Sequence, residues 1–192
     1  MKSFILFLLI SAFSMLANAN NSEKQIVYEK VKQYANLVSC YNSFNANLDL
    51  GTEVKTGLSD VFLVEKEPEH IEYYVFWEGD MGCSGGNGSV SSFITNIWKN
   101  PKSHKDFYII GNDAFGADLD LNYRFIEKIY QISKDEFKII SWDYADEKYG
   151  GIDGGQNFPA NKFEYTLKLQ KRIGWQVTKK RLLEQSLDQS LE

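Results

Sequence analysis

Cysteine and histidine are scarce in this 192-residue chain, which holds two of each: Cys40, Cys83, His70 and His104. A structural zinc site needs four thiolate or imidazole ligands close together, and two thiols without two nearby histidines do not supply them. A papain-like thiol enzyme needs a nucleophilic cysteine besides a disulfide pair, and there is no third cysteine. The composition therefore predicts no structural zinc site and no thiol catalysis.

Long apolar runs are also lacking after the first residues of the chain. Phe4 to Ile10 is an unbroken apolar run that follows the basic Lys2, and Ala17-Asn18-Ala19 offers the small residues that a signal peptidase requires. We therefore expect residues 1–19 to be a cleaved signal peptide.

A membrane anchor is the alternative interpretation of this segment. Ser11 and Ser14 interrupt it, and its apolar run is shorter than the roughly 20 residues that cross a bilayer. No cysteine lies near the cleavage point, so the lipoprotein route is excluded. We expect residues 20–192 to form a single exported domain, periplasmic or secreted, with no membrane span in the mature chain.

Basic residues are fewer than acidic residues in this chain, 21 against 26. The formal net charge is −5, and removal of residues 1–19 takes away one lysine and no acid, which makes it −6. Nucleic acids and anionic membrane surfaces require a concentrated basic face, so the charge argues against both as partners. A basic protein or a cation is compatible with it.

The two cysteines are best interpreted as one disulfide, because an exported protein matures in an oxidising compartment. We predict a bond between Cys40 and Cys83, which are separated by 43 positions in the sequence.

Apolar periodicity predicts one helix near the start of the mature chain. Ser22 and Gln25 resemble a capping box, and the apolar positions from Val27 to Val38 recur on one helical face. A packed helix over residues 23–39 follows. Cys40 would then tie the end of this helix to the rest of the domain.

Strand-like segments dominate the remainder. They are rich in β-branched and aromatic residues and are separated by turn residues, as in antiparallel sheets. The candidates are residues 56–65, 70–79, 89–98, 106–111, 122–132, 136–144, 162–170 and 173–181. Residues 121–132 also suit one face of a helix, and hairpins are expected at Ser133–Asp135 and Lys171–Gly174. The predicted fold is α+β, an N-terminal helix packed on a twisted antiparallel sheet.

A glycine-rich segment, Glu78 to Ser89, is the most unusual part of the sequence, with five glycines among twelve residues. It lacks the Gly-Lys-Ser/Thr ending of a phosphate-binding loop. Ser84 would need a histidine within hydrogen-bond reach to act as a nucleophile, and His70 lies at the far end of the preceding strand. We expect a loop held by the disulfide, with Asp80, Ser84 and Asn87 as binding residues.

Acidic residues gather in two further loops, 113–120 and 143–153. The first departs from an EF-hand because Tyr123 replaces the required glycine. In the second, Asp143, Tyr144, Asp146 and Asp153 are predicted binding residues, and an irregular calcium site is an open alternative. No other cofactor is expected.

Two functions remain open from the sequence. Adjacent aromatic residues such as Tyr73 and Tyr74 point to opposite faces of a strand. Either both faces of that strand are covered, or aromatic rings are exposed and available to a protein or glycan.

Because catalytic motifs are lacking, we expect a non-enzymatic binding protein that recognises another protein. It is comparable in size and disulfide content to small exported inhibitors and immunity proteins. The alternative is a secreted hydrolase of glycans or esters that draws its carboxylates from Asp80, Asp113, Asp143 or Asp153.

Overall fold

A computed structural model describes residues 22–45, 55–86, 88–102, 108–116, 119–152 and 158–186. The predicted signal peptide, residues 1–19, lies outside the described residues, as do Asn87 and Asp153. Among the described residues, no helix is both long enough and apolar enough to span a membrane.

The N-terminal helix covers residues 22–38. Val27, Val31 and Ala35 are fully buried along one face, as their spacing predicts. The chain then enters β1 (Ser39–Asn42) without an intervening loop. The helix confirms the α+β class.

The first sheet contains five antiparallel strands: β1, β2 (Val61–Glu67), β3 (His70–Met81), β4 (Ser91–Lys99) and β5 (Ile109–Gly111). Its order is β1-β3-β4-β5, and β2 also pairs with β3. A short 3₁₀ helix, η1 (Leu58–Asp60), leads into β2. The twelve-residue β3 is therefore the central strand, and it runs the whole length of the sheet.

The second sheet is an antiparallel meander of β6 (Ile126–Ser133), β7 (Glu136–Asp143), β8 (Asn161–Gln170) and β9 (Gly174–Gln185). Both predicted hairpins are present, between β6 and β7 and between β8 and β9. The segment that also suited a helix is a strand, preceded by the 3₁₀ helix η2 (Tyr123–Phe125).

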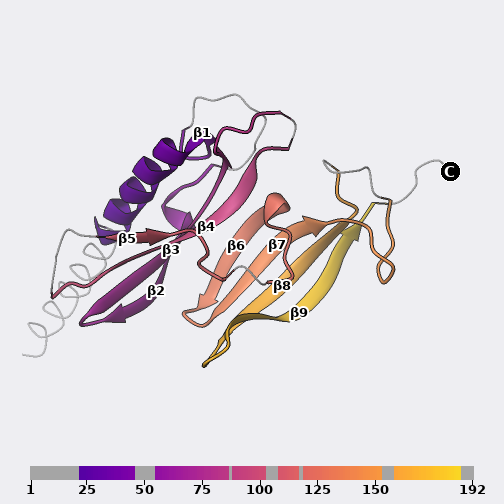
Figure 1. Cartoon of the computed structure of the whole chain (residues 1–192). Helices are drawn as coiled ribbons and strands as arrows, with labels where there is room; N and C mark the ends of the chain where they lie inside the picture. The colour runs from indigo at the N-terminus through magenta and orange to yellow at the C-terminus, as the bar shows by residue number, and fades with distance from the viewer. Residues whose placement is uncertain are drawn as a thin grey trace, which may run out of the picture.

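Three layers result, because the first sheet lies between the helix and the second sheet (Figure 1). Tyr73, Val75 and Trp77 pack with the helix, whereas Tyr74 and Phe76 pack with the second sheet. Both faces of β3 are thus covered, which resolves the alternative that its alternating aromatic residues left open.

The core between the two sheets is mainly aromatic. Phe137 on β7 contacts Phe62, Phe115 and Trp175, with ring centroids 5.6, 5.2 and 5.4 Å apart. The indole Nε1 of Trp175 donates a buried 3.1 Å hydrogen bond to the Tyr74 hydroxyl. Apolar burial therefore joins the sheets, together with polar contacts such as this one.

The outer face of the second sheet is charged. Glu164 on β8 pairs with Lys138 on β7 and Arg181 on β9, at 3.4 and 3.1 Å. This solvent-exposed face explains why polar and apolar residues alternate along β8, where Phe163, Tyr165 and Leu167 point inward and are fully buried.

Candidate functional site

The glycine-rich loop connects β3 to β4 and is exposed from Gly82 to Gly86. Its backbone has positive φ at five described positions: Gly82, Cys83, Gly85, Gly86 and Gly88. Only glycine adopts such angles without steric strain, so the glycines permit a conformation that other residues resist.

Three contacts fix this loop to the scaffold. The predicted disulfide joins Cys83 to Cys40 on β1, with the two Cα atoms 5.1 Å apart. The Gly82 amide donates to the Val38 carbonyl oxygen at the end of the helix, at 2.8 Å. The loop is therefore tied both to β1 and to the helix.

Asp80 supplies the third contact, from inside the loop. Its carboxylate oxygens accept hydrogen bonds from the Ser84 and Gly85 amides, both at 3.0 Å, and the residue is 7% exposed. Asp80 thus organises the loop, whereas the Ser84 side chain lies at the surface. His70 is the first residue of β3 and Ser84 lies beyond its last residue, so the two are at opposite ends of the strand, as the strand length predicts.

The second predicted loop begins at Asp143, at the end of β7. One carboxylate oxygen of Asp143 accepts a 2.9 Å bond from the Tyr144 amide. The other accepts from the Tyr165 hydroxyl and pairs with the Lys180 ammonium, at 3.4 and 3.2 Å. Burial is the main cause of a raised pKa at Tyr165, and the nearby negative charge of Asp143 raises this pKa further.

Asp146 lies further along the same loop and is exposed. Its carboxylate accepts from the Lys148 and Tyr149 amides at 2.9 and 2.7 Å, which closes a turn on which Glu147 is also exposed. Backbone amides are therefore the partners of this carboxylate, as in an Asx turn.

Both predicted loops lie at one end of the sheet pair. At this end, the Ser92 hydroxyl near the start of β4 donates to the Ile126 carbonyl oxygen at the start of β6, at 3.5 Å. Figure 1 shows the glycine-rich loop at the top and the loop after β7 at the right, both away from the β2–β3 and β8–β9 hairpins at the lower left.

An apolar hollow of about 290 Å³ opens beside the loop after β7. It is lined by Phe125, Trp142, Phe158, Pro159 and Ser186. Phe158 is 69% exposed, so an aromatic side chain borders this hollow at the surface.

Glu78 is a buried carboxyl at the same end, and its burial was not predicted from the sequence. It is 9% exposed, and the Ser92 hydroxyl donates to it at 3.3 Å. Loss of hydration raises its pKa from an ordinary value of 4.5 to about 7, although the Ser92 bond acts in the opposite direction.

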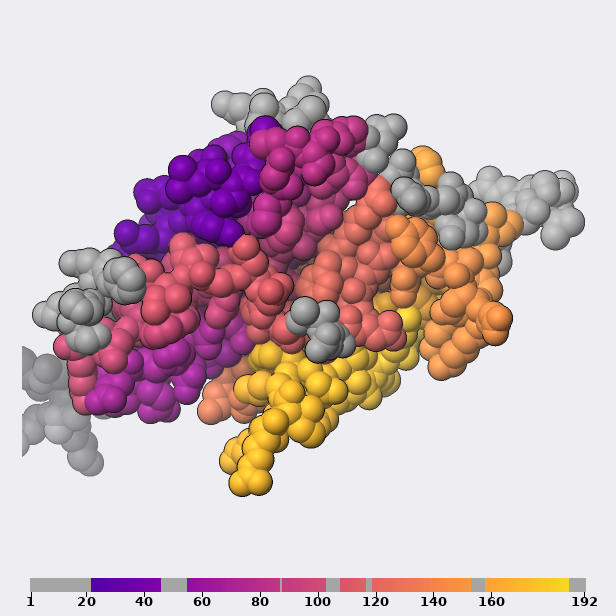
Figure 2. Space-filling view, in the orientation of Figure 1, coloured from indigo at the N-terminus to yellow at the C-terminus, as the bar shows by residue number. Residues whose placement is uncertain are grey.

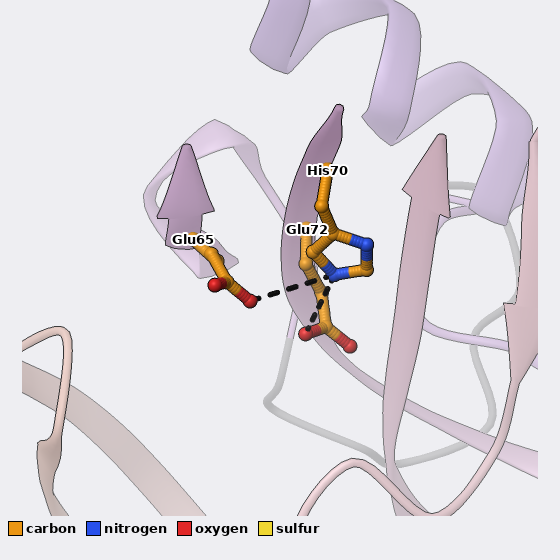
Figure 3. A group of neighbouring side chains, drawn as sticks. All are labelled: Glu65, His70 and Glu72. Atoms are coloured by element: carbon orange, nitrogen blue, oxygen red, sulfur yellow. Dashed lines mark ion pairs between the residues drawn. The ribbon is translucent and has the colours of Figure 1, made fainter. Parts of the chain in front are cut away.

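A second cluster lies at the opposite end of β3. The imidazole Nε2 of His70 is 3.6 Å from a carboxylate oxygen of Glu65 and 3.6 Å from one of Glu72 (Figure 3). Sequence reasoning missed this cluster because it weighed His70 as a partner for Ser84. The His-x-Glu spacing, which places both residues on one strand face, was the available signal.

Glu65 and Glu72 also line a cleft of about 380 Å³ between the two sheets, together with Lys134, Asp135 and Leu169 from the second sheet. Figure 2 shows the ends of the two sheets standing apart as separate lobes at the lower edge of the molecule. The two carboxylates are thus accessible to small molecules from the cleft, and the His70 side chain beside them is 34% exposed.

No protein-family model, curated protein or solved structure matches the chain.

Proposed function

We propose that this chain is an exported, non-enzymatic binding protein that recognises another protein, in the manner of an inhibitor or immunity protein. The glycine-rich loop and the loop after β7 form its recognition end. Export rests on the predicted signal peptide and agrees with the disulfide between Cys40 and Cys83.

The observation that carries this proposal is an exposed loop held in one conformation. The disulfide and the Asp80 carboxylate both restrain the backbone around Ser84. A loop that is ordered before binding loses less conformational entropy on association, which raises affinity without further contacts. Inhibitor loops use this physical strategy.

The surroundings of the loop suit a protein partner with a basic surface. Phe158 offers an exposed aromatic ring of the kind that anchors protein interfaces. Asp146 and Glu147 add exposed negative charge in the neighbouring loop, which favours association with a positively charged patch.

The alternative, a carboxylate hydrolase, receives less support from these contacts. Such enzymes need two acids facing one cleft. Of the suggested acids, Asp80 accepts bonds from two loop amides, and Asp143 is engaged by Lys180 and Tyr165. Their carboxylates are therefore occupied by structural partners.

The test is affinity capture from the extracytoplasmic fraction of the producing cells, with a matched pair of variants as bait. Ser84→Arg adds a bulky cation to the exposed loop, and Gln170→Arg adds the same side chain beside the β8–β9 hairpin. We expect wild type and Gln170→Arg to retain one partner at a stoichiometric level, and Ser84→Arg to lose it. Equal recovery with both variants, or no stoichiometric partner for the wild type, contradicts the proposal.

A further inference from the structure

Two carboxylates face each other directly across β2 and β3. Glu65 is the cross-strand partner of Glu72, and a register shift between Leu63 and Glu65 creates this pairing. Like charges directly opposite each other in an antiparallel pair are destabilising. The arrangement favours a cation between the two side chains.

His70 completes a three-sided group around this position. It lies two residues before Glu72 on the same strand and therefore on the same face. Its Nε2 atom is 3.6 Å from one oxygen of each carboxylate, and the three donor atoms lie within 4.8 Å of one another. Figure 3 shows both carboxylates directed at the same imidazole nitrogen.

These separations fit coordination to a shared ion better than mutual hydrogen bonding. A distance of 3.6 Å is longer than a hydrogen bond between nitrogen and oxygen. Ligands bound at about 2.0–2.2 Å to a tetrahedral ion are about 3.4 Å apart along each edge. The two nitrogen–oxygen separations are therefore close to this edge length, and the donor atoms of the two carboxylates lie within 4.8 Å of each other.

Neighbouring side chains orient the donors. The Asn96 amide donates a 3.1 Å hydrogen bond to the Oε1 atom of Glu72, while the Oε2 atom of Glu72 faces His70. The space for Asn96 depends on Gly111, since a Cβ atom there would lie 2.5 Å from the Asn96 oxygen. The His70 ring packs on Trp98, with centroids 5.1 Å apart.

Such outer contacts are typical of metal centres, where hydrogen bonds fix the direction of a ligating carboxylate. Exposure decreases across the group: the side chains of Glu65, His70 and Glu72 are 50%, 34% and 17% exposed. An ion can therefore enter from solvent and rest against the more buried carboxylate.

We propose that Glu65, His70 and Glu72 bind one divalent cation of the zinc class, with its remaining coordination positions open to the cleft between the sheets. Two carboxylates and a neutral imidazole neutralise a doubly charged ion. The imidazole donor favours Zn²⁺ over Ca²⁺ and Mg²⁺, which prefer oxygen ligands. Three protein ligands leave at least one position for water or a small ligand, as in zinc sites that react with bound molecules.

The cleft offers space for such a ligand. Its volume of about 380 Å³ lies within the range of small-molecule sites. Lys66 and Lys134 line it along with Glu65 and Glu72, so a ligand with an anionic group would meet both an ammonium and the ion. This site is at the opposite end of β3 from the glycine-rich loop and is independent of protein recognition there.

The experiment is calorimetric titration of the EDTA-treated, dialysed and tag-free protein with ZnCl₂. We expect one ion per chain with a dissociation constant in the micromolar range or below. His70→Ala and Glu72→Gln should each weaken binding at least 10-fold, and Asn96→Ala should weaken it about 10-fold through loss of carboxylate orientation. His104→Ala is the matched control, because it removes the other histidine of the chain, and binding should be unchanged.

Thermal unfolding of each variant checks its fold, and Glu65→Gln provides a second ligand variant at a half-exposed position. With Co²⁺ as probe, the visible absorption of the wild type should be lost in His70→Ala. Zn²⁺ binding that does not saturate, that survives His70→Ala, or that depends on His104 overturns the proposal. Tighter binding of CaCl₂ than of ZnCl₂ overturns the assignment to the zinc class.

Discussion

At the scale of single residues, burial decides what each polar side chain does. Asp80 was predicted as a binding residue, and the structure places its carboxylate beneath the loop, where it accepts two amide hydrogen bonds. Glu78, two residues earlier, is equally hidden but has the Ser92 hydroxyl as its partner. These two buried acids therefore have different hydrogen-bond partners.

Glu78 makes the fold less stable as pH rises. Its pKa is about 7 in the folded chain and near 4.5 when it is hydrated, so the folded state binds the proton more tightly. The stabilisation is complete below pH 4.5 and is lost as pH rises to about 7. By linkage, this amounts to about 3 kcal/mol at most.

Glu78→Gln removes this titration and keeps an oxygen for Ser92. In urea unfolding, the variant should match the wild type near pH 4.5 and exceed its free energy of unfolding by up to about 3 kcal/mol at pH 8. Glu147→Gln, at an exposed acid, is the control and should follow the wild type. Parallel curves for Glu78→Gln and the wild type across this range would show that Glu78 is not desolvated.

At the scale of elements, the disulfide links the start of β1 to the loop after β3. Cys40 follows the helix by two residues, so one bond restrains the helix end, a sheet edge and the recognition loop. Closing a loop of 43 positions stabilises a fold by about 4 kcal/mol on grounds of chain entropy.

The double variant Cys40→Ser and Cys83→Ser should therefore lose about 4 kcal/mol of unfolding free energy in urea. Hydrogen exchange should quicken at the Ser84 and Gly85 amides, because the Asp80 contacts then hold a looser loop. In the middle of β8, the exchange rates should rise only by the amount that the loss of global unfolding free energy accounts for. Unaltered exchange at Ser84 and Gly85 would mean that the loop does not depend on the disulfide.

Most elements were predictable because their patterns are local. The helix follows from the apolar spacing of Val27, Val31 and Ala35, and β8 follows from strict alternation. β1 was missed because the four residues from Ser39 to Asn42 carry no such pattern. The strand ending at Gln185 extends beyond its predicted end, since the polar residues there keep pairing with the start of β8.

At the scale of the whole molecule, the three layers depend on contacts far apart in the sequence. The sequence predicts the fold class but not the division of the strands between two sheets, because no local pattern states which strands pair. The cleft cluster was hidden for the same reason, since Glu65 meets Glu72 only through an irregular register. Asp143 on β7 likewise pairs with Lys180 on β9, across the intervening strand β8.

The aromatic contact between the sheets should dominate stability. Phe137→Ala removes a fully buried ring and should lower the free energy of unfolding by about 3–5 kcal/mol. Ile132→Ala, on the neighbouring β6 and 54% exposed, is the control and should change it by less than about 0.5 kcal/mol. Similar losses in both variants would contradict a core shared between the two sheets.

Site-specific photo-crosslinking in the producing cells tests whether one end of the molecule recognises a protein. A benzophenone amino acid would replace Ser84 in the glycine-rich loop or, as a control, Gln170 at the opposite end. We expect a single abundant protein adduct from position 84 and none from position 170. The absence of an adduct at position 84, or equal adducts at both positions, would contradict it.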